Sequence, residues 1–226
     1  MTPRVVFLQH SDLDVPGLLG RLCREAGWDT RACRADLGES ALPAVGTFDV
    51  LVVLGSGESV LDSSVPWIRP ERELVADTVG AGVAVLGVCF GGQLLAQVLG
   101  GEVTRAADPE IGWREVGSLD PARIPPGPWL EWHEDAFSAP PGAEVLARNE
   151  ASLQAYVAGI HTGVQFHPEV TRGIVSRWVD DALERDRLLP HQGTELLEGF
   201  EAGGSGIETR TTALWDAYLQ RAGYRR

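Results

Sequence analysis

The fold is indicated by one stretch of sequence, Val83-Ala84-Val85-Leu86-Gly87-Val88-Cys89-Phe90-Gly91-Gly92-Gln93. Its apolar, β-branched first half is typical of a strand buried on both faces. Gly87 and Gly91 flank Cys89 at two residues on either side, and a strained strand-to-helix turn needs such small neighbours around a nucleophile. The helix that follows would direct free N–H groups at the sulfur, which favours thiolate and stabilises an oxyanion. The stretch therefore predicts a nucleophile elbow.

Strands and helices alternate on both sides of this elbow. Apolar runs at 5–8 and 48–54 predict two further buried strands, and helical periodicity is present at 18–26, 66–80 and 91–99. This alternation predicts an α/β fold with a mostly parallel central sheet and helices on both faces, in which ligands bind at the carboxyl ends of the strands. Short antiparallel strands and loops are expected between 102 and 163. We expect one domain over 1–226, with a catalytic core at 1–171 and a helical C-terminal extension at 172–226.

Composition excludes several classes of function. The chain has 226 residues, of which 44% are hydrophobic, and its 19 basic and 32 acidic side chains give a net charge of −13. Such an acidic surface repels phosphate backbones and anionic lipid, so neither nucleic acid nor a membrane is expected as a partner. The absence of a long apolar run and of a signal peptide predicts a cytoplasmic protein. Three cysteines are too few for a disulfide framework or a structural zinc site, and we expect no metal and no cofactor.

A base for Cys89 is present later in the chain, in Gly163-Val164-Gln165-Phe166-His167-Pro168-Glu169. His167 follows an apolar run and could accept the thiol proton. Glu169, two residues on, could bond the other ring nitrogen and fix its tautomer. An α/β-hydrolase places its acid before the histidine, so the order found here disfavours a carboxylester hydrolase.

With these two segments the chain resembles the class I glutamine amidotransferases, whose glutaminase domains carry a Gly-x-Cys-x-Gly-x-Gln elbow and a later His-Pro-Glu segment. The resemblance covers roughly 50–171 and is strongest to short, stand-alone members. It implies a flavodoxin-like fold, with Cys89 as nucleophile, His167 as general acid/base and Glu169 as its orienting partner. No cofactor is implied.

The resemblance also implies an oxyanion hole and a glutamine pocket. The oxyanion hole would consist of the N–H of Phe90 and an N–H of the loop after the second strand, from Ser56 or Gly57. Ser56 departs from the family's Gly-Gly-Pro pattern, which leaves open which of the two contributes. Glu134 likewise replaces a small residue of the family's His-Gly-Asp segment. The residues implied to bind substrate are Gly55, Gln93, Trp132, His133 and Asp135.

Three functions remain open. In the first, the chain hydrolyses the side-chain amide of L-glutamine through a γ-glutamyl thioester on Cys89 and supplies ammonia to a separate synthase subunit. In the second, it is a stand-alone γ-glutamyl peptidase that acts on γ-glutamyl amides. A non-catalytic binding paralogue is the third, disfavoured because Cys89, His167 and Glu169 are all present.

Overall fold

The computed structural model describes residues 2–202 and 206–225 and contains a nine-stranded mixed sheet. The strand order is β2-β1-β3-β4-β9-β8-β7-β5-β6. The strands are β1 (Arg4–Gln9), β2 (Asp29–Arg34), β3 (Val50–Val53), β4 (Ala84–Val88), β5 (Val103–Ser118), β6 (Gly127–Phe137), β7 (Glu144–Arg148), β8 (Leu153–Ala158) and β9 (His161–Val164).

The first half of the sheet is parallel. Strands β2, β1, β3, β4 and β9 pair in parallel, and every residue of β3, β4 and β9 is buried. Continuous apolar sequence in β3 and β4 matches this burial on both faces. Strand β2 is an addition to the predicted strands. It lies at the sheet edge, and only Cys33 in it is buried.

The second half is antiparallel, from β9 through β8 and β7 to the β5–β6 hairpin. Antiparallel strands were expected here, but β5 and β6 are long, with 16 and 11 residues. A register shift between Arg105 and Glu110 interrupts their pairing. Such an irregularity bends a strand and redirects its side chains, which explains the weak periodicity of this region.

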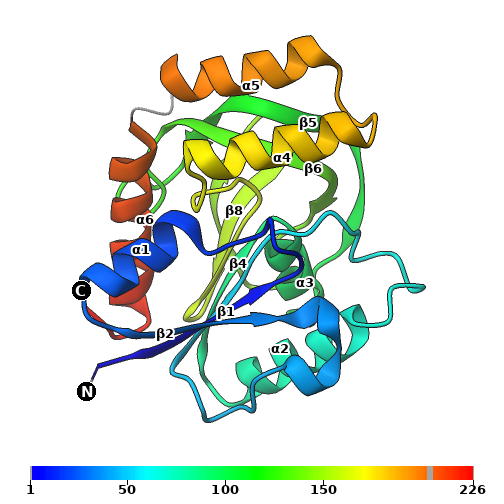
Figure 1. Ribbon diagram of the computed structural model, residues 1–226. Helices are drawn as coiled ribbons and strands as arrows, with labels where there is room; N and C mark the ends of the chain where they lie inside the picture. The colour runs from blue at the N-terminus through cyan, green and yellow to red at the C-terminus, as the bar shows by residue number, and fades with distance from the viewer. Residues whose placement is uncertain (1, 203–205, 226) are drawn as a thin grey trace.

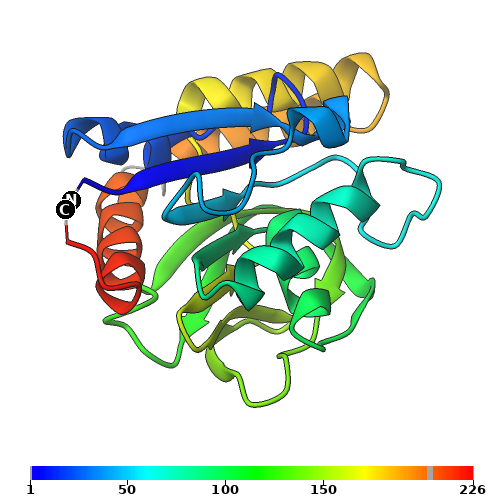
Figure 2. The same ribbon diagram turned by 90° about the horizontal axis from the view of Figure 1, so that it is seen from below.

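Helices cover both faces of the sheet. They are α1 (Gly17–Glu25), α2 (Ile68–Gly80), α3 (Phe90–Val98), α4 (Arg172–Glu184), α5 (Pro190–Ala202) and α6 (Ile207–Arg221). Buried side chains of α1, α4 and α6 belong to one hydrophobic cluster, and those of α2 and α3 to another on the opposite face. Figure 2 shows strands β1 and β2 with the gold helices above them and the teal helices below.

The C-terminal helices pack on their own chain. In α6, Leu214, Trp215, Tyr218 and Leu219 are all buried, and the helix lies beside α1 (Figure 1). Helix α5 lies along β5, where Trp113 Nε1 donates to the Leu196 carbonyl at 3.0 Å. No helix within the described part of the chain combines the length and apolar content needed to cross a bilayer.

Candidate active site

Cys89 sits on a strained turn between β4 and α3. Its backbone has φ 51° and ψ −110°, a region that non-glycine residues rarely adopt. The turn is held because Cys89 N donates to the Val164 carbonyl of β9 at 2.8 Å. A Cβ atom at Gly91 would lie 2.1 Å from the Val53 carbonyl oxygen, so only glycine fits there. The strand-to-helix turn predicted from sequence is present, with Cys89 directly before the first residue of α3.

His167 and Glu169 lie just beyond the carboxyl end of the neighbouring strand β9. His167 Nδ1 is 2.7 Å from Glu169 Oε1, and both side chains are buried. Among the residues described, His167 Nε2 makes no hydrogen bond of acceptable geometry, although Cys89 lies close enough to raise the pKa of the ring. Burial acts to lower the pKa of His167, but the charges of Glu169 and Cys89 outweigh it and the pKa lies well above its ordinary value. One ring nitrogen is thus held by Glu169, and the other has no hydrogen bond within the described structure.

The backbone of this segment is held by two distant helices. Leu18 N, in the first turn of α1, donates to the Glu169 carbonyl at 2.8 Å. Thr211 Oγ1, a buried hydroxyl of α6, donates to the Pro168 carbonyl at 2.6 Å. The orientation of Glu169 therefore depends on both ends of the chain.

The loop after β3 passes close to both Cys89 and His167. A Cβ at Gly55 would lie 2.8 Å from His167 Cε1 and 3.7 Å from Cys89 Cβ, so a side chain there would displace the histidine. His10 lies 2.7 Å by Nδ1 from the Gly55 carbonyl and 3.0 Å by Nε2 from Glu71 Oε1. Burial acts to lower the pKa of His10, but Glu71 raises it above its ordinary value. A protonated His10 donates from both nitrogens and clamps the loop.

A cavity of about 680 Å³ opens on the Cys89 side of the loop. At the wall of this cavity, Gln93 Nε2 donates to the Asp135 carbonyl at 3.0 Å. Asp135 also accepts a hydrogen bond from Ser59 and lies 3.2 Å from Arg105 Nη1. The cavity brings together most of the predicted site residues, namely Ser56, Gly57, Cys89, Phe90, Gln93, Trp132, His133 and Asp135.

The predicted binding residue His133 is already bonded within the protein. Its Nδ1 is 3.0 Å from the Asp135 carbonyl, and its Nε2 is 3.2 Å from Glu110 and 3.4 Å from Glu131. Burial raises the pKa of Glu131 to about 7. Burial opposes protonation of His133, but hydrogen bonds to Glu110 and Glu131 raise its pKa to about 10. The three groups form a buried cluster of charge beside the cavity, in which neither carboxylate oxygen of Glu131 has a well-formed hydrogen bond among the described residues.

A second cavity, of about 330 Å³, lies on the His167 side of the same loop. Gly55, predicted as a binding residue, faces this cavity and does not line the first one. Trp178 of α4 packs edge-to-face on His167, with ring centroids 4.9 Å apart. Ser56, Gly57, Glu58, Trp132 and Arg187 line both cavities, so the two hollows meet at the loop.

Sequence reasoning missed several of these groups. Gln165 Nε2 lies 3.6 Å from Cys89 Sγ, and its position two residues before His167 was the available signal. His10 directly follows β1, and a polar residue at the carboxyl end of a parallel strand is a candidate by position alone. Trp178 and Arg187 belong to the helical extension, where no motif indicated a site.

The chain was compared with known proteins by sequence and by structure. A family model, glutamine amidotransferase class-I, matches residues 39–177. GMP synthases of Aeropyrum pernix and Thermus thermophilus are 37% and 42% identical over 182 and 190 residues, which is 72% and 73% of this chain. The chain spans only 33% and 36% of those two relatives.

Solved structures extend the similarity to nearly the whole chain. A glutamine amidotransferase from Methylobacillus flagellatus superposes with a TM-score of 0.88 at 26% identity, covering 98% of this chain and 96% of that one. One from Thermotoga maritima gives 0.86 at 25% identity, covering 99% and 100%. The strained cysteine elbow, the later histidine and the matched family model agree. The chain belongs to the class-I glutamine amidotransferase family.

Proposed function

We propose that this protein hydrolyses the side-chain amide of L-glutamine through a γ-glutamyl thioester on Cys89. One observation carries the proposal. Cys89 occupies a strained elbow beside His167, whose Nδ1 is held by Glu169 at 2.7 Å while Nε2 makes no other hydrogen bond in the described structure. A cysteine beside a histidine that a carboxylate orients is the arrangement that nucleophilic catalysis needs.

The reaction follows from the positions of these groups. The Cys89 thiolate attacks the carboxamide carbon, and the N–H of Phe90 with an N–H of the Ser56–Gly57 segment stabilises the oxyanion. His167 gives its proton to the departing ammonia as the carbon–nitrogen bond breaks. Water, deprotonated by His167, then attacks the thioester and releases glutamate. Glu169 keeps the ring oriented in both steps.

The cavity on the Cys89 side suits the amino-acid end of glutamine. Asp135 offers a carboxylate to the α-amino group, and Arg105 offers a guanidinium to the α-carboxylate. Gln93 supports this wall through its bond to the Asp135 backbone. Arg105 Nη1 lies 3.2 Å from Asp135 and 2.9 Å from Glu134, so a zwitterionic ligand would exchange partners with these ion pairs at the cavity wall.

Ammonia released here would be used by a separate protein. The GMP synthases that match are about three times as long as the aligned part. A relative from Sulfurisphaera tokodaii, named as one subunit of a glutamine-hydrolysing GMP synthase, is 46% identical over 94 residues, and the chain covers 50% of it. A glutamine-hydrolysing unit on its own chain therefore has a precedent among the relatives. We infer a synthase subunit as the ammonia acceptor.

A second candidate function is hydrolysis of larger γ-glutamyl amides without a partner. The observation that favours it is the cavity of about 330 Å³ on the His167 side, where the leaving group departs. The same thioester chemistry at Cys89 would serve both functions, and they differ only in the group that leaves.

The test of the proposed function is release of ammonia and glutamate from L-glutamine by the purified chain. Cys89→Ala is expected to lower kcat at least about a thousandfold, since removing a nucleophile removes the covalent route. Cys33→Ala, a cysteine of edge strand β2, is the matched control and should keep full activity. Turnover that survives in Cys89→Ala would contradict the proposal.

Labelling separates an inactive site from a gated one. If glutamine is not hydrolysed but a glutamine-like electrophile still labels Cys89, the site is competent and awaits its synthase. If Cys89 is neither labelled nor active, the protein is a binding paralogue and the proposed function fails.

A further inference from the structure

Cys89 and His167 face two different cavities. Cys89 lines only the cavity of about 680 Å³, and His167 lines only the cavity of about 330 Å³. In amide cleavage the acyl carbon bonds to sulfur and the departing nitrogen takes its proton from the histidine. The acyl group therefore lies on the Cys89 side, and the leaving group on the His167 side.

We propose that the His167-side cavity is a leaving-group site for an amino acid, and that γ-glutamyl amino acids are substrates of this protein. The proposal rests on the Cys89 chemistry given above and names the substrate class for it. Ammonia is close to water in size, and one water molecule occupies about 30 Å³ in the liquid. A cavity of about 330 Å³ is far larger than ammonia requires.

Aromatic rings form one wall of this site. Trp132 and Trp178 meet edge-to-face with centroids 6.0 Å apart. Trp178 is fixed because its Nε1 donates to the Leu13 carbonyl at 3.1 Å. Rings held in this way offer apolar surface beside the proton donor, which suits the side chain of an apolar or aromatic amino acid.

Arg187 supplies a positive charge at the same site. Within the described residues its guanidinium makes no ion pair, whereas nearby Arg185 is paired with Asp181 at 2.9 Å. Arg187 Nη1 is 4.0 Å from the Cβ position of Gly57, at the loop that separates the two cavities. A free guanidinium here would bind the carboxylate of the departing amino acid.

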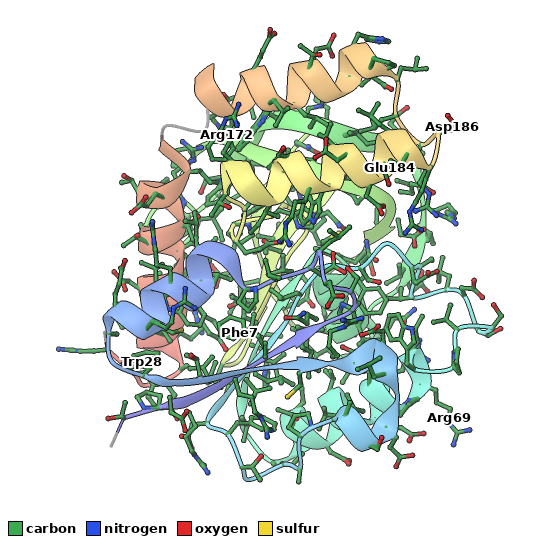
Figure 3. All side chains as sticks on the ribbon, viewed as in Figure 1. Phe7, Trp28, Arg69, Arg172, Glu184 and Asp186 are labelled. Carbon is green, nitrogen blue, oxygen red and sulfur yellow. The ribbon has the colours of Figure 1, made fainter. Side chains whose placement is uncertain are left out.

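The turn that carries Arg187 is structured. Arg187 N donates to the Ala182 carbonyl at 2.8 Å and Asp186 N to the Leu183 carbonyl at 3.2 Å, the two bonds of a Schellman motif. Asp186 takes the left-handed position with φ 54°. Figure 3 shows Asp186 at the turn after Glu184, where α4 gives way to α5. The arginine backbone is thus fixed relative to α4.

Most of this wall lies outside the region matched by the family model. The matched residues 39–177 contain all of the Cys89-side lining except Arg187. The His167-side lining adds the segment after β1 and the end of α4, both outside that range. The acyl site is thus shared with the family model, whereas the leaving-group site is built largely by flanking segments of this chain.

The bond changes are those of an ordinary amide transfer. Cys89 Sγ bonds to the γ-carbon, the carbon–nitrogen bond breaks, and the His167 proton goes to the amino nitrogen of the leaving amino acid. Water then cleaves the thioester and restores the thiol. In reverse, an amino acid bound at this site can attack the thioester, with His167 taking its proton.

The experiment compares three substrates of the whole chain: L-glutamine, γ-L-glutamyl-L-phenylalanine, and γ-L-glutamyl-phenethylamide, which lacks only the leaving carboxylate. We expect kcat/KM for the dipeptide to exceed that for glutamine at least about tenfold. Arg187→Ala should lower kcat/KM for the dipeptide relative to the phenethylamide on the order of tenfold, the worth of one hydrogen bond to a charged group. Arg69→Ala is the matched control, because that arginine lies on the exposed surface of α2, where it pairs with Glu73 at 2.9 Å, and lines neither cavity (Figure 3).

A second measurement uses the site as an acceptor site. With glutamine as donor and added L-phenylalanine, wild type should form γ-glutamyl-phenylalanine, and Arg187→Ala should form less.

Each outcome of the substrate comparison either supports or overturns the inference. Glutamine cleaved without dipeptide cleavage overturns this inference and leaves the proposed function intact. Equal losses on all three substrates would assign Arg187 to the glutamyl carboxylate and overturn its role here. No hydrolysis of any substrate overturns both proposals.

Discussion

His10 illustrates how a side chain that does not reach the reacting atoms can set their geometry. It stacks on Trp67 and packs against the tilted ring of Phe90, with ring centroids 5.0 and 4.8 Å away, and it bonds the Gly55 carbonyl. Fixing that carbonyl fixes the peptide plane whose N–H begins the Ser56–Gly57 segment. His10 is therefore a positioning residue for the proposed oxyanion hole.

The combined variant His10→Phe with Glu71→Leu tests this role. It keeps a ring in the stack and leaves no unpaired buried charge, so folding should be little affected. We expect kcat for glutamine to fall roughly tenfold with KM nearly unchanged, because the loss is one of transition-state stabilisation. Steady-state kinetics and urea unfolding measure the two effects. Glu71→Gln alone should retain activity, since a neutral His10 still donates to Gly55; an unchanged kcat in the double variant would refute the role.

At the scale of elements, the β5–β6 hairpin carries a titratable cluster that links stability to pH. Glu131 and His133 both hold their protons more tightly in the folded chain, with pKa values of about 7 and about 10. A group whose pKa is raised by folding stabilises the protein below its unfolded pKa and loses that contribution as pH rises through its folded pKa. The contribution of this hairpin to the free energy of unfolding should therefore fall as pH rises.

We expect the free energy of unfolding to fall from about pH 4.5 to about pH 10, with the Glu131 contribution lost between about pH 4.5 and 7 and the His133 contribution between about pH 6.5 and 10. Urea unfolding at several pH values measures this slope. Glu131→Gln keeps the shape of the side chain and should flatten the lower part of the slope, between about pH 4.5 and 7. A wild-type stability that stays constant or rises over this range would contradict the assignment.

The elements that could be predicted from sequence are those with strong local patterns. Strands β3 and β4 are continuous apolar runs, and the glycines around Cys89 encode the elbow directly. Strand β2 could not be predicted, because its sequence Asp29–Arg34 is mostly exposed at a sheet edge and lacks both periodicities. The full length of β5 could not be predicted, because the register shift between Arg105 and Glu110 interrupts the alternation of its side chains.

The residues of the candidate site fall into the same two groups: those that a local motif predicts and those that depend on tertiary packing. Cys89, His167 and Glu169 follow from two short motifs, since each motif lies at the end of a predicted strand. The contributions of Trp178, Arg187 and Thr211 could not be predicted, because they depend on how distant helices pack against the core. The division into a core at 1–171 and an extension at 172–226 stays a prediction, although residues of that extension line a cavity of the site.

On the scale of the whole molecule, the support of the His167 segment comes from α1 on one side and α6 on the other. These helices pack against each other at the side of the molecule where both chain ends lie (Figure 1). Packing of the chain ends and the geometry of the site are therefore coupled.

Thr211→Val tests this coupling with almost no change in shape. It removes the hydroxyl bonded to the buried Pro168 carbonyl, and we expect a loss of roughly 1–3 kcal/mol in the free energy of unfolding. The kcat for glutamine should fall as well, because the segment before Glu169 loses a restraint. Thr194→Val is the matched control, since its hydroxyl makes a similar bond to the Pro190 carbonyl on the exposed surface of α5. Equal effects of the two variants would rule out the coupling.

The bond between Thr211 and Pro168 joins residues 43 positions apart, and its donor is the later of the two. During synthesis on the ribosome, strand β9 and the histidine after it emerge well before α6 does. A nascent chain therefore contains Cys89 and His167 before Thr211, which supports the segment around His167, has been added. The order of translation delays completion of the site until the rest of the fold has been made.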